Sequence, residues 1–516
     1  GSIAMCIHRK YIYLLAFVYL SIPLYLFLLS WLHIYYGAFC TVVLLFCAYR
    51  IFQHVKKNVG TSSLCIGRYH VFSLLLILLF LFITGHGGFI GTNGVDIPWR
   101  DAIYNDLIRY PWPIVYEHSH TMLIYYLTYW LLPAGISWLF GLGTWGSHVV
   151  LFFWSYMGLS LVFLLLCDYL QPAKNQVLFV CGLFLLWSGL SLFGMMLKSL
   201  FGASAFRIDD YPGFYSWQFT AGMYDGHFIG YFLRTTFDSV ANVYNQYIPM
   251  AVVTLLFLEC RYMYDMYAFL GLLALPYSPL GFVGIVLLMM GDGVYQIIHD
   301  IRQGERLLSR HIKKYISLEN LLSGVIILPV FYFYFTVNSM SQKAVETGIW
   351  AAPLSAYGLF RIGNLLLFYL LSFGMYCFLL YRDNRLNFLY WWASGILILL
   401  PFFRVGLTGD FLWNASVAPY LLIMMLALKQ LLTAWDKKQF WGADLLLLIC
   451  VLVAAITPLM QMTTSIRGCF LQKQVSVYLD AEKINGTFAD KPADDLLNFL
   501  AKDYKEQIFY KYLSKK

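Results

Sequence analysis

Five ionisable residues gather in one short polar stretch between two apolar segments of the chain. The stretch runs from Gly91 to Tyr116 and reads GTNGVDIPWRDAIYNDLIRYPWPIVY; its charged residues are Asp96, Arg100, Asp101, Asp106 and Arg109. Ionisable groups at the mouth of a hydrophobic bundle are costly to keep there, which makes them candidates for a functional site. A carboxylate close to a guanidinium could act as a general base or bind a metal ion.

A helix is predicted inside this stretch, because Pro98 and Pro111 bracket a segment with helical spacing. Asp101 and Asn105 share one face of that helix, and Asp96 lies just before its start. We therefore take Asp96 and Asp101 as the candidate catalytic residues. The alternative is that these acidic residues only cap the helix and form ion pairs at the membrane interface.

Aromatic and basic side chains of the same stretch could hold a substrate. Trp99 and Trp112 offer ring faces, and Arg100 lies between them in the sequence. The sequence His118-Ser119-His120 could supply metal ligands. Only two ligands are visible there, and hydrogen bonding at the interface is the alternative.

A second polar stretch, residues 199–239, mixes aromatic residues with charged ones. Its candidates are Arg207, Asp209, Asp210, Asp225, His227, Arg234 and Asp238. Such a mixture suits sugars, because ring faces stack on aromatic side chains while hydroxyls take polar partners. Among these residues, Asp210, Asp225 and His227 are the expected substrate ligands. The alternative is an ordinary solvated loop with aromatic anchors.

Further polar residues lie near the ends of apolar segments. Asn242, Asn245 and Gln246 open one segment, and Arg404 and Asp410 lie between two others. We expect Asn245, Gln246 and Asp410 to contact substrate. A fixed guanidinium at the interface suits an anionic phosphate, which makes Arg404 a candidate for that role. Snorkelling of the Arg404 side chain toward water is the alternative.

The elements that must position these residues are membrane helices. Of 516 residues, 60% are hydrophobic and 12% are charged, about half the charged fraction of a soluble protein. Continuous apolar runs predict an all-α, polytopic helical bundle of about 11–13 spans, because backbone groups in lipid must be satisfied within the helix. The candidate spans lie near 11–29, 31–49, 70–90, 121–142, 148–168, 176–197, 240–258, 266–291, 321–337, 364–381, 388–403, 413–434 and 442–460.

The distribution of charge predicts how the bundle is oriented. The net charge of +8 is modest and gives no reason to expect nucleic acid as a partner. Basic clusters lie at His8–Lys10, Arg50–Arg68, Arg302–Lys314, Arg382–Arg385 and Lys437–Lys438. The positive-inside rule places these clusters in the cytoplasm. The stretch 91–120 and the tail 461–516 are then both expected outside.

Simple counting of spans fails in the middle of the chain. It places residues 199–239 inside, whereas their composition is that of an outer loop. One segment must therefore be re-entrant or built of short half-helices, and 266–291 is the candidate, because Pro276 and Pro279 should break it. Irregular backbone at membrane depth must line a cavity or be buried in protein. We therefore expect a cavity beneath the outer loops that opens toward lipid.

The chain is expected to divide into three parts. Residues 1–69 are expected to form an N-terminal hairpin with a basic cytoplasmic loop. Residues 70–460 should form the core, with extracytoplasmic loops at 86–120 and 199–239. Residues 461–516 form a polar tail in which short amphipathic helices are predicted at 492–503 and 505–514. The ten cysteines are scattered without a CxxC pair and are expected to be small buried hydrophobic residues.

The first polar stretch also carries a family-like pattern. Residues 96–107 read D-x-x-W-R-D-A-I-Y-N-D-L and are followed by Trp-Pro and a segment with Tyr-Tyr. Further on come WSGLSLFG (187–194), NQYIP (245–249), SPLGFVG (278–284) and GDFLWNASVAP (409–419). Over residues 70–430 this pattern resembles the GT-C superfamily of integral membrane glycosyltransferases, in particular bacterial members.

The resemblance implies a polyprenyl-phosphate-linked sugar as donor and an acidic residue of the first loop as catalytic base. Asp96 is the best match for that acid and Asp101 the second. Arg404, Arg234 and Arg207 are the expected donor-phosphate ligands, and a divalent metal (Mg or Mn) is a further implied cofactor. Asn414 departs from the pattern, since the relatives carry Arg four residues after the position of Asp410. Two spans precede the acidic loop, where the superfamily commonly has none, which indicates an added hairpin.

The function expected from the sequence is transfer of a sugar to an extracytoplasmic glycan, lipid or protein acceptor. The expected location is the bacterial inner membrane, with the site facing outside. Two other classes remain open: a transporter or flippase, or a polymerase or ligase, for lipid-linked saccharides; and a non-catalytic scaffold in envelope assembly.

Overall fold

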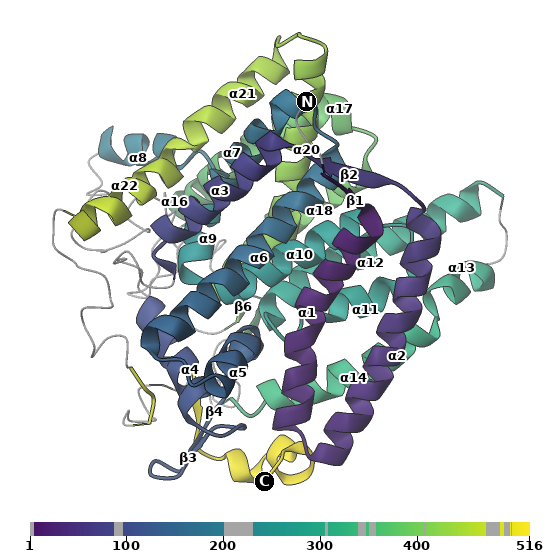
Figure 1. Ribbon diagram of the computed structural model, residues 1–516. Helices are drawn as coiled ribbons and strands as arrows, with labels where there is room; N and C mark the ends of the chain where they lie inside the picture. Colours follow the sequence, from purple (N-terminus) through teal and green to yellow (C-terminus); the bar gives the residue numbers. More distant parts are fainter. Residues whose placement is uncertain are drawn as a thin grey trace.

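The structure is a computed structural model of the 516-residue chain. It describes residues 5–86, 96–200, 231–304, 308–338, 347–349, 358–405, 409–470, 486–489, 496 and 498–516. The predicted all-α polytopic bundle is confirmed: eight helices within these residues are long and apolar enough to cross a membrane. Figure 1 shows most helices running between two ends, one near the N-terminus and one near the C-terminus. We call them the basic end and the tail end.

The first two long helices form a hairpin. Helix α1 (Arg9–Trp31) runs from the basic end to the tail end, and α2 (Ile34–Val59) returns. The helices pack closely at Gly37, where an added Cβ would lie 2.1 Å from the Leu28 carbonyl oxygen. Only glycine allows this approach. Strands β1 (Met5–His8) and β2 (Ser63–Ile66) pair antiparallel at the open end of the hairpin.

The segment predicted as a span at 121–142 is not one. After α3 (Arg68–Ile83) and the loop helix α4 (Ile97–Arg109), it forms strand β4 (Thr121–Leu123), a 3₁₀ turn (Thr128–Trp130) and the nine-residue helix α5 (Leu131–Leu139). Nine helical residues span about 14 Å, half of what the hydrocarbon layer requires. Apolar composition predicted the burial of this segment correctly but not its length as a helix.

The next helices connect the first polar stretch to the second. Helix α6 (Thr144–Leu170) ends at the basic end, where Asp168 meets Arg9, and α7 (Val177–Leu185) leads back from there. Helices α8 (Ser191–Leu200) and α9 (Thr236–Asn242) follow, and the Thr236 amide donates to the Trp187 carbonyl at 3.1 Å. Arg100 of α4 donates to the Asn242 carbonyl at 3.2 Å, so the end of α9 lies beside the first polar stretch.

The predicted break in 266–291 is confirmed. Helix α10 (Tyr244–Glu259) returns to the basic end, α11 (Tyr267–Leu272) stops after six residues, and α12 (Pro279–Arg302) starts afresh. Ser278 caps α12 by accepting from the Gly281 amide at 3.0 Å, and Pro279 takes the first helical position. Asp292 of α12 binds Tyr267 of α11 at 2.8 Å, so the pair enters from the basic end and returns to it.

The remaining helices complete the bundle. A short helix α13 (Leu308–Tyr315) lies at the basic end and leads to α14 (Leu318–Phe335). Helices α16 (Gly358–Tyr369) and α17 (Met375–Asn384) are joined by a π-helical turn, and α18 (Phe388–Leu399) follows. The last are α19 (Asp410–Ala415), α20 (Val417–Asp436), α21 (Ala443–Ala454) and α22 (Ile456–Phe470).

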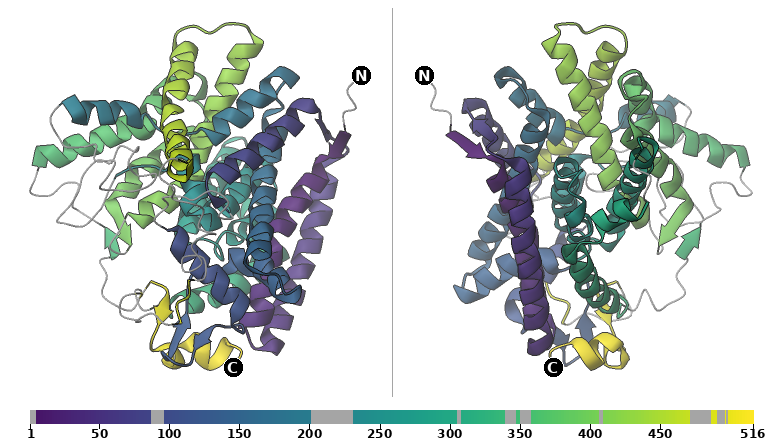
Figure 2. Two further views of the ribbon diagram at one scale, coloured as in Figure 1. Left: turned by 60° about the vertical axis from the view of Figure 1, so that its left-hand side comes forward. Right: turned by 90° about the vertical axis from the view of Figure 1, so that its right-hand side faces the viewer.

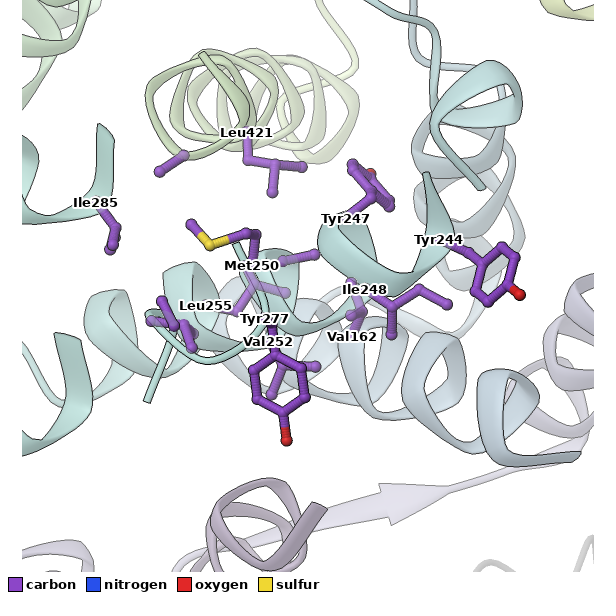
Figure 3. Close-up of a cluster of buried hydrophobic side chains, with 14 of the residues drawn as sticks. Val162, Tyr244, Tyr247, Ile248, Met250, Val252, Leu255, Tyr277, Ile285 and Leu421 are labelled. Carbon is purple, nitrogen blue, oxygen red and sulfur yellow. The ribbon is translucent and has the colours of Figure 1, made fainter. Parts of the chain in front are cut away.

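The core is centred on α10. Every residue of this helix from Tyr244 to Leu258 is buried. Figure 3 shows its side chains meeting Val162 of α6, Ile285 of α12 and Leu421 of α20. Burial on all sides explains why this helix is apolar around its whole circumference beyond its first turn.

The tail lies against the tail end. Strand β7 (Leu500–Ala501) pairs with β4, which also pairs with β3 (Val115–Tyr116). Figures 1 and 2 show the C-terminus beside these strands. The prediction of a helix at 492–503 is wrong where the structure describes it, since residues 498–503 are turn, strand and bend. The helix predicted at 505–514 is present only as a π-helical turn, Phe509–Leu513. Strand pairing with β4 replaces the amphipathic packing that the spacing suggested. A further strand pair joins β5 (Thr347–Ile349) and β6 (Phe403–Val405).

Ion pairs join helix ends at the basic end. Arg9 binds Asp168 at 2.8 Å and Glu259 at 3.1 Å. The others are Arg50–Glu319, His54–Asp265, Arg261–Asp292 and Arg382–Asp444. Most of the acidic partners are buried. Removing one partner of a buried pair leaves an uncompensated charge, so these contacts fix how the helix ends meet.

Cys6 and Cys65 form a disulfide between β1 and β2, which corrects the expectation that the cysteines are only buried hydrophobic residues. Two criteria for orientation disagree here. Disulfides persist in oxidising compartments, whereas the five basic clusters predict the cytoplasm. The charge distribution draws on five separate segments, and the disulfide on one pair of cysteines.

Membrane-impermeant maleimide labelling tests this arrangement. We expect Glu117→Cys and Lys505→Cys, in a background free of native cysteines, to react from the same side of the membrane. Lys437→Cys should react only from the other side, since it lies in a basic cluster at the opposite end. Labelling of positions 117 and 505 from opposite sides would contradict the arrangement.

Candidate active site at the tail end

Helix α4 presents the acidic residues of the first polar stretch. Pro98 lies in its first turn, and the helix ends at Arg109, shortly before Pro111, as the sequence predicts. Asp96 occupies the N-cap position, but its side chain accepts no capping hydrogen bond. The carboxylate of Asp96 is 30% exposed. Asp96 therefore does not cap the helix, but the ion pair that the same alternative included is present, with Arg100 at 3.8 Å.

Arg100 fixes α4 to the rest of the bundle. Its guanidinium is buried, donates from Nε to the Asn242 carbonyl at 3.2 Å and donates from Nη1 to the Tyr125 hydroxyl. The Asp96 carboxylate lies 3.8 Å from Arg100 Nη2. A buried guanidinium requires such partners because desolvation of an unpaired charge is costly. Arg100 thus positions Asp96 as well as the helix.

Tyr125 brings a second region to the same place. Burial raises the pKa of its hydroxyl above the usual value; Arg100 opposes this shift, whereas the carboxylates of Asp96 and Asp410 add to it. The carboxylate of Asp410, at the exposed start of α19, also raises the pKa of the Tyr126 hydroxyl. Residues far apart in the sequence therefore converge around Tyr125.

Asp101 has a different environment from Asp96. Its side chain is buried, and within the described residues its carboxyl group has no hydrogen-bond or ion-pair partner. Burial raises its pKa to about 8. Asp101 is therefore protonated at neutral pH and can donate a hydrogen bond, as carboxylic acids in apolar sites do.

Asp106 anchors the tail. Its carboxylate is fully buried and accepts from the Thr487 hydroxyl at 2.7 Å, the Phe488 amide at 2.9 Å and the Tyr116 hydroxyl. Arg109 acts on this carboxylate electrostatically, but the hydrogen bonds make Asp106 the link between α4 and the tail.

The two tryptophans of the stretch have different roles. Trp99 is 37% exposed, and its ring stacks near Phe488 and Phe499 of the tail, at 6.1 and 5.8 Å. Trp112 packs against Trp31 at 5.5 Å and donates to the Leu107 carbonyl at 2.8 Å. Trp99 therefore keeps an exposed aromatic surface, whereas Trp112 serves packing.

A chain of polar contacts joins the first polar stretch to the second. Arg234 is buried 3.8 Å from Asp238 and lies over the Trp413 ring at 5.2 Å. Asp238 accepts from the Asn242 side-chain amide at 2.6 Å. The Asn242 carbonyl in turn accepts from Arg100. Arg234, Asp238, Asn242, Arg100 and Asp96 thus form one continuous series.

A small cavity of about 20 Å³, enough for about one water molecule, borders this series. Its walls include Arg234, Ser239, Tyr247 and Trp413. This cavity lies beside the described part of the second polar stretch. The expected larger cavity beneath both outer loops concerns residues 87–95 and 201–230, which lie outside the described residues.

The other candidates from the sequence divide into three groups. Gln246 is structural, because it accepts from the Ser278 hydroxyl at 2.8 Å, whereas the fully buried Asn245 amide has no hydrogen-bond partner within the described residues. Arg404 lies in β6, where its backbone pairs with Gly348; the position of its side chain is not described. Outside the described residues lie Arg207, Asp209, Asp210, Asp225 and His227.

Metal-ligand spacing does not support a divalent site in the described residues. No group of three or more His, Cys, Asp or Glu side chains gathers there, and His118 and His120 are exposed. The side chains in the described ranges do not fit a Mg or Mn centre, so we derive no chemical step through one.

Sequence reasoning missed Tyr125 as a site residue. The Tyr-Tyr pair was visible, but it stood inside a segment taken for a membrane span. The polar residues before and after that segment were the available signal that its Tyr hydroxyls would need partners.

Comparisons of the chain with models of known families, with curated proteins and with solved structures find no match.

Asp106→Asn should loosen the tail. The new amide places an NH₂ group among three donors, so at least one hydrogen bond is lost, at a cost of about 1–3 kcal/mol. We expect a lower melting temperature in detergent and faster trypsin cleavage in the tail. Asp503→Asn, an exposed change in the same tail, is the control. Equal cleavage of the two variants would contradict the anchoring role.

The raised pKa of Asp101 predicts how stability depends on pH. The folded-state pKa of about 8 exceeds the unfolded value of about 3.9, so the folded protein holds a proton that the unfolded chain releases. The contribution of Asp101 to the free energy of unfolding is complete below pH 4. It decreases as the pH rises to about 8, and the total loss is at most on the order of 5 kcal/mol. Asp101→Asn, which mimics the protonated form, should melt like the wild type at pH 4 and at a higher temperature than the wild type at pH 8.5. Parallel melting curves across this range would rule out the raised pKa.

Proposed function

We propose that the chain is a GT-C-type glycosyltransferase that moves a sugar from a polyprenyl-phosphate donor to a glycan, lipid or protein acceptor at its tail end. The series Arg234–Asp238–Asn242–Arg100–Asp96 carries the proposal. It joins a partly exposed carboxylate, suited to a base, to two buried guanidinium groups, suited to an anionic leaving group. The family pattern at residues 96–107 supports the same role.

The two acidic residues of α4 receive different roles. Asp96 is the proposed general base, because it is partly exposed, does not cap the helix and is held near Arg100. Asp101 is protonated at neutral pH and serves as a hydrogen-bond donor to substrate. This division rests on environment, which can separate an acid from a base among neighbouring carboxyl groups.

The proposed reaction is a displacement at the anomeric carbon of the donor sugar. The acceptor hydroxyl gives its proton to Asp96 as its oxygen forms the new bond. The bond between the anomeric carbon and the phosphate oxygen breaks, and its electron pair leaves with the lipid phosphate. Arg100 or Arg234 would stabilise this anion, with Arg404 and Arg207 as further candidates. The exposed ring of Trp99 offers a stacking surface for a sugar.

The eight candidate spans show a multi-pass membrane protein, which fits a donor that remains in the bilayer. We further propose that this membrane is the bacterial inner membrane and that the tail end faces outside. The basic clusters at the opposite end support this orientation.

Asp96→Asn tests the proposal, since it removes a base with little change in volume. We expect sugar transfer from a polyprenyl-phosphate sugar in membranes to fall by about 10²–10⁴-fold, with the melting temperature unchanged. Asp101→Asn should retain much more activity, because Asn also donates a hydrogen bond. Asp503→Asn is the control for loss of an acidic side chain.

Full activity of Asp96→Asn together with loss in Asp101→Asn would move the base by one helical turn. Full activity of both variants would refute the mechanism. Failure of both to accumulate in the membrane would instead favour a structural role for these carboxyl groups.

A further inference from the structure

A long apolar groove lies between helices α11, α12 and α14, at the opposite end from the proposed active site. Its volume is about 760 Å³, within the range of roughly 300–1,000 Å³ that ligand sites occupy. Its walls include Gly271, Met290, Val294, Gly324, Val325 and Leu328. The groove exists because α11 stops after six residues, which leaves α12 and α14 apart along the missing length.

The groove opens to the surroundings of the bundle. Met290, Val294 and Val325 on its rim are 62%, 55% and 71% exposed. The polar groups at its basic end are already used: Asn320 binds the Ala268 amide at 3.0 Å, and the Tyr315 hydroxyl donates to the Gly293 carbonyl at 3.3 Å. In a membrane-spanning bundle such a groove faces hydrocarbon, so its occupant must be an aliphatic chain.

A basic helix closes the end of the groove. Helix α13 contributes Tyr315 to the groove wall, and Lys314 and Asp300 tie it to α12 at 3.7 Å. Arg310 and Lys313 of α13 are exposed, beside the exposed apolar residues Leu308 and Ile312. A short helix with exposed basic and apolar side chains suits the headgroup layer of a membrane that contains anionic lipids.

We propose that this groove binds one anionic phospholipid, with an acyl chain between α12 and α14 and its phosphate on Arg310 and Lys313. Charge complementarity selects the occupant, because the apolar groove alone would accept any lipid chain whereas the basic helix favours an anionic headgroup. The site lies at the basic end and is independent of the proposed transfer reaction. Helices α12, α13 and α14 lie on the side of the molecule that the right-hand view of Figure 2 turns toward the reader.

Lipid titration into the delipidated full-length protein tests the proposal, with native mass spectrometry counting bound lipid. The probes are dioleoyl phosphatidylglycerol and dioleoyl phosphatidylcholine, which share their chains and differ in charge. We expect one phosphatidylglycerol to bind more tightly than phosphatidylcholine. Arg310→Gln with Lys313→Gln should weaken phosphatidylglycerol binding by roughly 30-fold, whereas Lys56→Gln with Lys57→Gln, an equal loss of exposed charge at the same end, should not.

Filling the groove provides the second arm. A Cβ at Gly324 meets no atom within 4 Å, so Gly324→Leu should occupy the groove without a clash and abolish the tight site. Gly395→Leu in α18 is the matched control, because its Cβ is equally free and lies outside the groove. Equal affinity for the two lipids, or unchanged binding in both the Gly324 and the Arg310/Lys313 variants, would overturn the proposal. If Gly324→Leu fails to fold, the Arg310/Lys313 variant and the comparison of the two lipids still test the proposal.

Discussion

The burial of the Arg100 guanidinium organises the tail end of the molecule. A guanidinium cannot be left without partners in a desolvated site, where breaking its contacts costs several kcal/mol. Arg100 therefore binds α4 to the carbonyl of Asn242 and to Tyr125, which come from two other parts of the chain. Asp96 and Asp410 gather around the same centre, and Asp106, two turns further along α4, fixes the tail against it. The candidate site exists because these contacts force separate segments together.

The two ends of the bundle use charge differently. At the basic end, most buried carboxylates lie in ion pairs with Arg, as in Arg9–Asp168 and Arg261–Asp292. At the tail end, Asp96 remains partly exposed and Asp101 has no hydrogen-bond partner within the described residues. Buried ion pairs stabilise helix contacts, whereas a partly exposed carboxylate such as Asp96 can still reach a substrate although Arg100 lies 3.8 Å away. This contrast supports the proposal that the chemistry takes place at the tail end.

Sequence patterns predicted those features that depend on local physics. Apolar runs predicted the bundle, and Pro276 and Pro279 predicted the break between α11 and α12. The prediction of a span at 121–142 was wrong, because hydropathy measures burial and cannot distinguish a membrane helix from a strand and a short helix that are buried in protein. The role of Asp106 was missed for another reason. Its partners Thr487 and Phe488 lie about 380 residues further along the sequence, and no local sequence pattern predicts such a contact. The convergence on Tyr125 is likewise a product of tertiary structure.

The position of a bound donor phosphate tests the proposed transfer site most directly. Electron cryo-microscopy of the full-length protein in nanodiscs, with a non-hydrolysable polyprenyl-phosphate sugar analogue, would locate it. We predict phosphate density within hydrogen-bonding distance of Arg100 or Arg234, with the anomeric carbon facing Asp96. Phosphate density at the basic end, or a sugar placed away from α4, would contradict a transfer site built on Asp96 and Arg100.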